Sequence, residues 1–139
     1  AVARELRIDA GEASARLARA KAALLVLRAT RVRPGLDDKV LTSWNALAIA
    51  GLARASRALA DPGLDDLARD AADALRRTVW RDGRLYATRR DGAPALPAYL
   101  DDHAFLLDAL VERMQNAFRV EDYEWAIALT DALLERLQS

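Results

Sequence analysis

The chain has 139 residues, of which 53% are hydrophobic and 30% charged, a balance that can bury a core without a metal ion or a disulfide bond. Its 21 basic and 21 acidic residues leave no net field to attract phosphates, so we expect no nucleic-acid partner. The absence of cysteine excludes disulfide frameworks, thiolate zinc sites and a Cys-x-x-Cys redox centre.

The longest apolar stretches, at 22–27 and 47–52, are much shorter than the roughly 20 residues of a membrane-spanning helix. No signal-type apolar run follows the basic start of the chain. We therefore expect a soluble, cytoplasmic protein without a membrane partner. Nineteen of the cationic residues are Arg and alanine is abundant, a composition that favours a bacterial source.

The first predicted helix spans about residues 11–31. Its apolar residues are spaced by four and three positions, which places them on one stripe that we expect to face a core: Ala13, Leu17, Ala20, Leu24 and Leu27. The Arg33-Pro34-Gly35 segment ends this helix, because proline moves the preceding residue out of the helical region.

The second predicted helix begins at a cap formed by Thr42 or Ser43. It is apolar on more than one face, which predicts an inner helix with neighbours on both flanks, and its main stripe carries Trp44, Leu47, Gly51 and Leu59. The third helix starts after Asp61, which can cap it, with Pro62 in the first helical position.

Helical periodicity is lost over 81–97, where Asp82-Gly83 and Asp91-Gly92 are turn sequences on either side of an extended segment at 84–88. We expect a loop with at most a short β-ribbon there. Two more helices follow, at about 101–118 and 121–137, the second with Tyr123, Ile127 and Leu134 facing inward.

Helices two and three align with helices four and five at an offset of 58 or 59 positions, which indicates a helix-hairpin repeat. The sequence thus predicts an all-α fold of antiparallel hairpins. Helices two and four should be adjacent and roughly parallel, and the segments that lead into them should lie at the same end.

Two motifs precede the inner helices: Arg33-Pro34 with the run 37–45, Asp-Asp-Lys-Val-Leu-Thr-Ser-Trp-Asn, and the run 99–106, Tyr-Leu-Asp-Asp-His-Ala-Phe-Leu. With these motifs the chain resembles the helical part of the spermatogenesis-associated thioredoxin-like proteins. Two departures stand out: Ala46 occupies a position where that family has glycine, and His103 one where tyrosine is common.

This resemblance implies a thioredoxin-like domain followed by an (α/α)6 toroid, similar to the toroids of N-acylglucosamine 2-epimerases and six-hairpin glycosidases. The expected domain organisation is a single helical domain over 1–139 that forms one segment of the toroid, with the thioredoxin-like domain absent. In related toroids the ligand sits in a funnel at the loops that lead into the inner helices, which is where both motifs fall.

The resemblance gives nine candidate site residues. As catalytic candidates we take Asp102, His103 and Asp38; as substrate-binding candidates we take Asp37, Lys39, Trp44, Asn45, Tyr99 and Asp101. Carboxylates, a titratable imidazole, aromatic rings and an amide are the groups that a sugar site needs. We expect neither a metal ion nor a cofactor, because consecutive helical residues do not converge on one ion.

Structural roles compete with these assignments. Asp101 is also suited to capping the fourth helix, and a single histidine at the start of a buried helix is commonly structural. Adjacent residues on a helix do not face one another, so neither Asp37-Asp38 nor Asp101-Asp102 is a catalytic dyad by itself. Trp125 lies beside an apolar stripe and is expected in the core.

Two functions from different classes follow. One is a toroid segment that contributes to a carbohydrate-type binding funnel in a longer protein of epimerase-like or glycosidase-like activity, with the fragment alone inactive. The alternative is a helical-repeat scaffold that binds proteins without catalysis. A segment cut from a ring would expose apolar helix faces, so we expect the isolated chain to form homo-oligomers.

Overall fold

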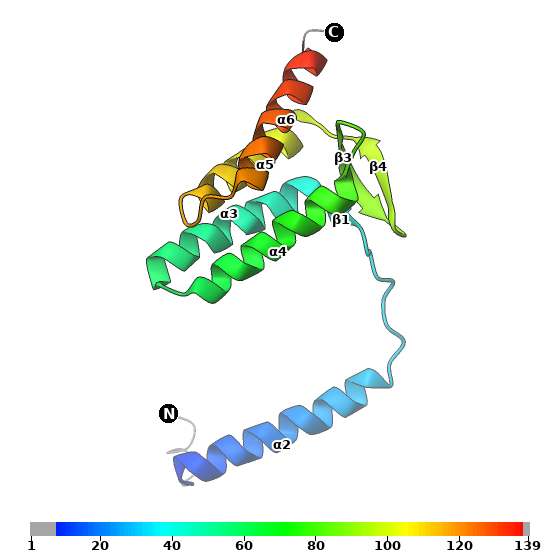
Figure 1. Cartoon of the computed structure of the whole chain (residues 1–139). Coiled ribbons are helices and arrows are strands. Elements are labelled where there is room, and N and C mark those ends of the chain that lie inside the picture. Colours follow the sequence, from blue (N-terminus) through cyan, green and yellow to red (C-terminus); the bar gives the residue numbers. More distant parts are fainter. Residues whose placement is uncertain (1–7, 138–139) are drawn as a thin grey trace. The chain divides into compact units, whose positions relative to one another are not determined.

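The structure, a computed structural model, describes residues 8–137 (Figure 1). Its contacts divide the chain into two compact units, Ala1–Leu36 and Asp37–Ser139. The helix of the first unit is α2 (Ala10–Ala29). Asp9 caps it, because its Oδ1 accepts hydrogen bonds from the backbone N–H groups of Gly11 (2.7 Å) and Glu12 (3.0 Å).

The apolar stripe of α2 is not buried within its own unit. No residue of this helix is buried, and Leu17 and Leu24 are 56% and 65% exposed. Among the described residues of this unit, no second helix or strand offers a surface on which the stripe can pack, so its inward face stays a prediction.

The second unit contains two helix hairpins. The first pairs α3 (Thr42–Leu59) with α4 (Pro62–Val79), and the second pairs α5 (Leu100–Met114) with α6 (Val120–Leu137). Helix α5 begins 58 positions after α3, and α6 begins 58 positions after α4. These starts confirm the helix-hairpin repeat and its offset.

Helices α3 and α5 lie side by side and run in the same direction (Figure 1). At their first turns, the Ser43 N–H donates to Oδ1 of Asp102 at 3.0 Å. At their far ends, Arg57 donates to the Glu112 carbonyl (2.9 Å) and to the Asn116 side-chain oxygen (2.6 Å). Because the first turns of the two helices are in contact, and so are their last turns, the helices are adjacent and parallel, as predicted.

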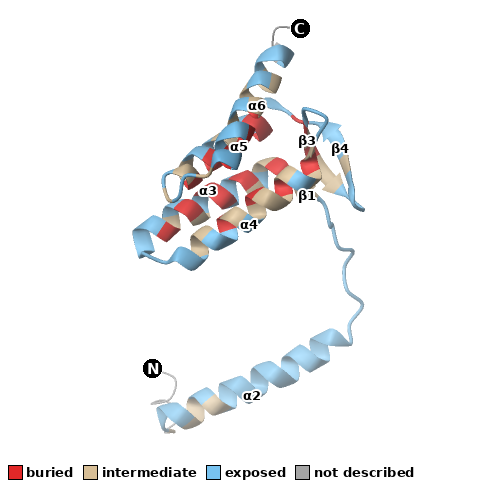
Figure 2. Cartoon of the chain, viewed as in Figure 1, coloured by how far each residue is buried: buried red, intermediate tan, exposed pale blue. Residues whose placement is uncertain are grey.

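The core lies between these helices and uses one face of each (Figure 2). Helix α3 buries Ala46, Ile49, Ala50 and Ala53, while Trp44, Leu47 and Leu59 of the predicted main stripe are exposed. Helix α6 likewise buries Trp125 and Leu129, and Tyr123, Ile127 and Leu134 are exposed. The predicted inward faces of α3 and α6 were therefore wrong, whereas the core position of Trp125 is confirmed.

Small side chains explain the face that α3 buries. Alanines at 46, 50 and 53 let α3 approach both α4 and α5, since close helix contacts need little side-chain volume. At 46, where the resembled family has glycine, the methyl group is fully buried in this contact.

A small antiparallel sheet lies at the end of the unit where α3 begins and α4 ends (Figure 1). Its strands are β1 (Val40–Leu41), β2 (Trp80–Arg81), β3 (Arg84–Arg90) and β4 (Ala93–Pro97), and β3 pairs with the other three. The predicted β-ribbon near 81–97 is thus present. Asp82 (φ 50°) and Gly83 (φ 72°) form the turn between β2 and β3, and both positive φ values identify it as type I′.

The sheet is tied to α3 by a buried hydroxyl. Thr42, expected as a possible cap, instead lies inside the helix, and its Oγ1 donates to the Tyr86 carbonyl at 2.6 Å. Next to it, the Ala98 N–H donates to the Leu85 carbonyl at 3.0 Å. Ala98 lies in the short segment that connects β4 to α5. Within residues 8–137, no helix is long and apolar enough to cross a membrane.

Candidate functional site

Asp102 joins the first turns of the two parallel helices. Its Oδ1 accepts the Ser43 N–H of α3 at 3.0 Å, and its Oδ2 accepts the Tyr99 N–H at the start of α5 at 2.9 Å. The side chain is 3% exposed. One carboxylate therefore satisfies an unpaired N–H at each of two helix N-termini, where the helix dipoles also favour negative charge.

The cap of α5 is not the one predicted from the sequence. Asp101, expected as a cap, is exposed in the first turn, while Tyr99 is the N-cap residue and Asp102 closes the capping box. Asp102 thus has a defined structural role as a bridge between helices. A carboxylate with both oxygens committed to backbone N–H groups is poorly suited to transferring protons.

His103 lies next to Asp102 in sequence but lines a separate space. Its Nδ1 is 2.9 Å from the Tyr99 carbonyl oxygen, and because a carbonyl only accepts, Nδ1 carries the proton. In the neutral ring Nε2 is then the acceptor. The residue is only 2% exposed, and it borders an open pocket of about 790 Å³.

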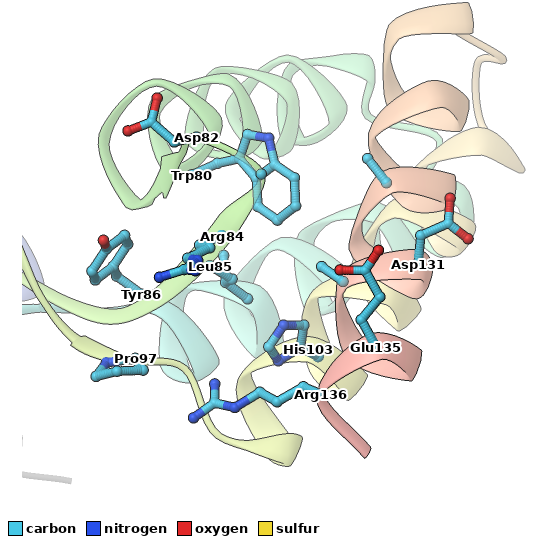
Figure 3. A pocket seen from close by; sticks show the side chains of 13 residues that line it. Trp80, Asp82, Arg84, Leu85, Tyr86, Pro97, His103, Asp131, Glu135 and Arg136 are labelled. Atoms are coloured by element: carbon cyan, nitrogen blue, oxygen red, sulfur yellow. The ribbon is translucent and has the colours of Figure 1, made fainter. Parts of the chain in front are cut away.

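The pocket is built from elements that are far apart in the sequence (Figure 3). The β2–β3 hairpin supplies one side, with Trp80, Arg84, Leu85 and Tyr86. The second half of α6 supplies the other side, and its carboxylates Asp131 and Glu135 are seen across from the hairpin with the His103 ring between them. Arg136 and Pro97 complete the edge where β4 ends.

Arg136 fixes the mouth of the pocket to the chain that enters α5. Its guanidinium Nη1 donates to the carbonyl oxygen of Ala98, which is buried. The contact holds the second half of α6 beside the segment 97–99 and therefore beside His103. Because this guanidinium is already hydrogen-bonded, its role at the pocket is to pack against the lining and to hold α6 in place.

The other motif residues lie at the same end of the helices but outside the pocket. Trp44 and Tyr99 are exposed, at 72% and 62%, and Asp101 is exposed as well. The backbone N–H groups of Ser43 and Tyr99, one from each motif, both donate to Asp102, which confirms that the two motifs lie at the same end of the hairpins. Of the nine candidate residues, the structure places His103 in the pocket.

Asp37, Asp38 and Lys39 interact mainly among themselves and with the sheet. The Lys39 N–H donates to Asp37 Oδ1 at 3.4 Å, and this bond together with the Lys39 side chain lowers the pKa of the Asp37 carboxyl. Asp38 lies 3.6 Å from Arg90 of β3. All three residues are exposed, and these contacts hold the segment that precedes β1 to the sheet.

Asn45 occupies the position in α3 that His103 occupies in α5. Its Nδ2 donates to the Leu41 carbonyl four residues earlier at 2.8 Å, just as His103 Nδ1 donates to the Tyr99 carbonyl. The two residues are 58 positions apart, in register with the repeat. Asn45 therefore closes the first turn of its helix, and its half-buried amide is largely used by that bond.

Sequence reasoning missed Trp80, Tyr86, Asp131 and Glu135 as members of one pocket. One signal was present: Asp131 and Glu135 are four residues apart and so project from the same face of a helix. The residues of the β2–β3 hairpin carried no such signal. No group of three or more potential metal-ligating side chains converges within the described part of the chain.

The fold and pocket define a helix-hairpin repeat unit that carries a small antiparallel sheet and a mixed aromatic and charged pocket at one end. The sequence matches no protein-family model. It is 30% identical over 118 residues to spermatogenesis-associated protein 20 of Homo sapiens, an alignment that covers 78% of this chain and 15% of that protein. The rat protein of the same name matches equally, at 30% identity over 78% of this chain and 15% of its own length.

A third relative, the uncharacterized protein B0495.5 of Caenorhabditis elegans, is 31% identical over 79% of this chain and 16% of its own length. These alignments support the spermatogenesis-associated family that the two motifs indicated. The chain spans about 15% of the length of the human and rat relatives. The relatives are animal proteins, and they give no support to the bacterial source expected from composition.

Proposed function

We propose that this chain forms part of a carbohydrate-type binding site in a longer protein, with His103 as the residue that exchanges a proton or a hydrogen bond with the ligand. The observation that carries the proposal is the fixed tautomer of His103, whose Nδ1 is bonded to Tyr99 while the ring borders the pocket. A ring nitrogen that carries no proton can accept a hydrogen bond from a sugar hydroxyl and so polarise it.

The remaining lining residues fit the same class of ligand. Trp80 and Tyr86 supply aromatic surface on which a pyranose ring can stack, and Asp131 and Glu135 supply acceptors for its hydroxyl groups. A volume of about 790 Å³ is within the range of small-molecule sites. As part of this proposal, the two parallel helices α3 and α5 are inner helices of an (α/α)6 toroid, and α4 and α6 are outer ones.

The internal repeat supplies the variant that tests this role. In His103→Asn, the new amide should keep the hydrogen bond to the Tyr99 carbonyl, because Asn45 makes the equivalent bond in α3. The variant should therefore fold like the parent while presenting no ring nitrogen to the pocket. We expect it to weaken sugar binding by roughly two- to tenfold, the worth of one hydrogen bond.

The measurement is calorimetric titration of the full-length protein that carries this chain with a panel of neutral and acidic monosaccharides. Phe118→Ala is the control, since that exposed ring makes a tilted contact with the Tyr123 ring, at 6.2 Å between centroids, and lies outside the pocket. Binding that is the same in His103→Asn as in the control, or no binding by any member of the panel, contradicts the proposal.

A second candidate function is the helical-repeat scaffold, which one specific observation favours. Helix α3 exposes an apolar stripe that includes Trp44, Leu47 and Leu59. Leaving such a stripe in water costs about 25 cal/mol for each Å². We therefore propose that this stripe contacts another helix, either in a longer protein or in a second copy of the chain.

The isolated chain is accordingly expected to self-associate at low micromolar concentration, and Leu47→Glu should shift it to monomer. Sedimentation equilibrium measures both. Leu67→Glu is the matched control, because Leu67 is exposed to a similar degree but lies on α4. A wild-type chain that is strictly monomeric, or an equal effect of the two substitutions, would refute this contact.

A further inference from the structure

The β2–β3 hairpin presents two arginines side by side. Arg81 and Arg84 are directly opposite each other across the type I′ turn, so their side chains project from the same face of the ribbon. Like charges in this position repel each other. Of this hairpin's charged residues, Arg84 and Asp82 line the pocket, and Arg81 lies beside Arg84 outside the lining.

Neither guanidinium is neutralised by the fold. Within residues 8–137, the side chains of Arg81 and Arg84 have no ion pair or hydrogen bond, although Asp82 lies between them in sequence. Elsewhere in the unit, arginines near acids are paired: Arg54 lies 3.0 Å from Asp108, and Arg113 lies 2.8 Å from Asp122. The hairpin thus leaves a cation available at the pocket.

The α6 side of the pocket carries two carboxylates. Asp131 and Glu135 project from α6 and also have no ion pair within the described residues (Figure 3). A neutral sugar would satisfy these carboxylates through its hydroxyls but leave Arg84 without a partner. A ligand with hydroxyl groups at one end and an anionic group at the other complements both sides.

We propose that the pocket selects a sugar that bears an anionic group, a carboxylate or a phosphate, and that Arg84 is the residue that binds this group. Arginine suits both, because its planar fork donates two parallel hydrogen bonds to either anion. Arg81 supports Arg84 through its charge. This inference rests on the proposed function, since it specifies the ligand of the same pocket.

The experiment compares glucuronate, glucose 6-phosphate and glucose as probes of the full-length protein, by calorimetric titration at low ionic strength. At least one of the two acidic sugars should bind roughly ten- to a hundredfold more tightly than glucose, the worth of a charge-assisted bond. The two acidic probes separate a carboxylate from a phosphate preference. Added salt should reduce the difference, because exposed charges are screened.

Arg84→Gln should remove most of this preference, measured as the ratio of acidic-sugar affinity to glucose affinity, and Arg84→Lys should retain part of it through its charge. Arg77→Gln is the matched control, because Arg77 is an exposed arginine of α4 that does not line the pocket. Glucose binding as tight as that of both acidic probes, or an Arg84→Gln effect no larger than that of the control, would overturn the inference and leave the carbohydrate pocket intact. Absence of binding by all three probes would overturn both.

Discussion

Replacing Arg113 by methionine is expected to lower the free energy of unfolding by about 3–5 kcal/mol at neutral pH. Arg113 of α5 and Asp122 of α6 form an ion pair at 2.8 Å, and both side chains are buried. Without the guanidinium, the carboxylate of Asp122 would be a buried charge without its partner. Urea denaturation of the chain, followed by far-ultraviolet circular dichroism, measures the change.

The stability that Arg113→Met loses should become smaller as the pH falls. Burial raises the pKa of Asp122 above its ordinary value, against the attraction of Arg113 and Arg119. A carboxyl group whose pKa is higher in the folded state contributes stability at low pH, and this contribution is lost as the pH rises through the folded pKa. Removing Arg113 raises that pKa further, so the variant should be most destabilised near neutrality and recover as the pH falls.

The control is the double variant Arg113→Met with Asp122→Leu, which removes both charges and should regain most of the lost stability. It also removes the buried Arg113 Nε, which has no hydrogen-bond partner. Two results would show that the ion pair is not required to hold α5 to α6. One is a stability loss of less than about 1 kcal/mol in Arg113→Met, and the other is a loss that does not become smaller as the pH falls.

Asp102→Ala is expected to cost about 2–3 kcal/mol, because each lost N-cap bond contributes about 1 kcal/mol and the two N–H groups it leaves are partly buried. The same denaturation experiment measures it. Asp102→Asn should be intermediate, since an amide has a single acceptor oxygen for the two N–H groups of Ser43 and Tyr99.

Asp101→Ala is the matched control for this prediction. Asp101 is the same residue type in the same helical turn, but it is exposed, so its loss should change stability by no more than about 0.5 kcal/mol. If the two alanine variants were equally stable, Asp102 would not bridge α3 and α5. The proposed sugar pocket would then lack the contact that sets where His103 lies.

Local signals in the sequence predicted the elements of the second unit well. Asp61 and Pro62 mark the start of α4, and the Asp82-Gly83 and Asp91-Gly92 turns mark the ends of β3, because each of these residues acts through its own backbone. The 58-residue repeat also predicted that α3 and α5 would be parallel neighbours. These features depend on short-range geometry or on internal similarity.

The buried faces of α3 and α6 could not be predicted in the same way. Helix α3 is apolar on two sides, and the periodicity of Trp44 and Leu47 is as regular as that of Ala46 and Ile49. The choice between the two faces depends on which helices lie nearby and how closely they approach. Small alanines favour close approach, and this outweighed the larger hydrophobic area of the other face.

The candidate site could be predicted even less well than the buried faces, because its residues come together only in the tertiary structure. The run 99–106 correctly drew attention to Asp102 and His103, yet their roles diverge because one side chain reaches α3 and the other borders the pocket. No sequence spacing predicts that an aspartate of α5 caps α3. The partners of His103 come from the β2–β3 hairpin and α6, whose contact with α5 exists only in the folded chain.

A crystal structure of the full-length protein, soaked with the acidic sugar that binds best, tests the proposed pocket most directly. We expect the sugar to occupy the pocket between the β2–β3 hairpin and α6, with a hydroxyl group within hydrogen-bond distance of His103 Nε2 and the anionic group on Arg84. A sugar bound instead on the exposed Trp44 and Tyr99 surface, with the pocket empty, would contradict it.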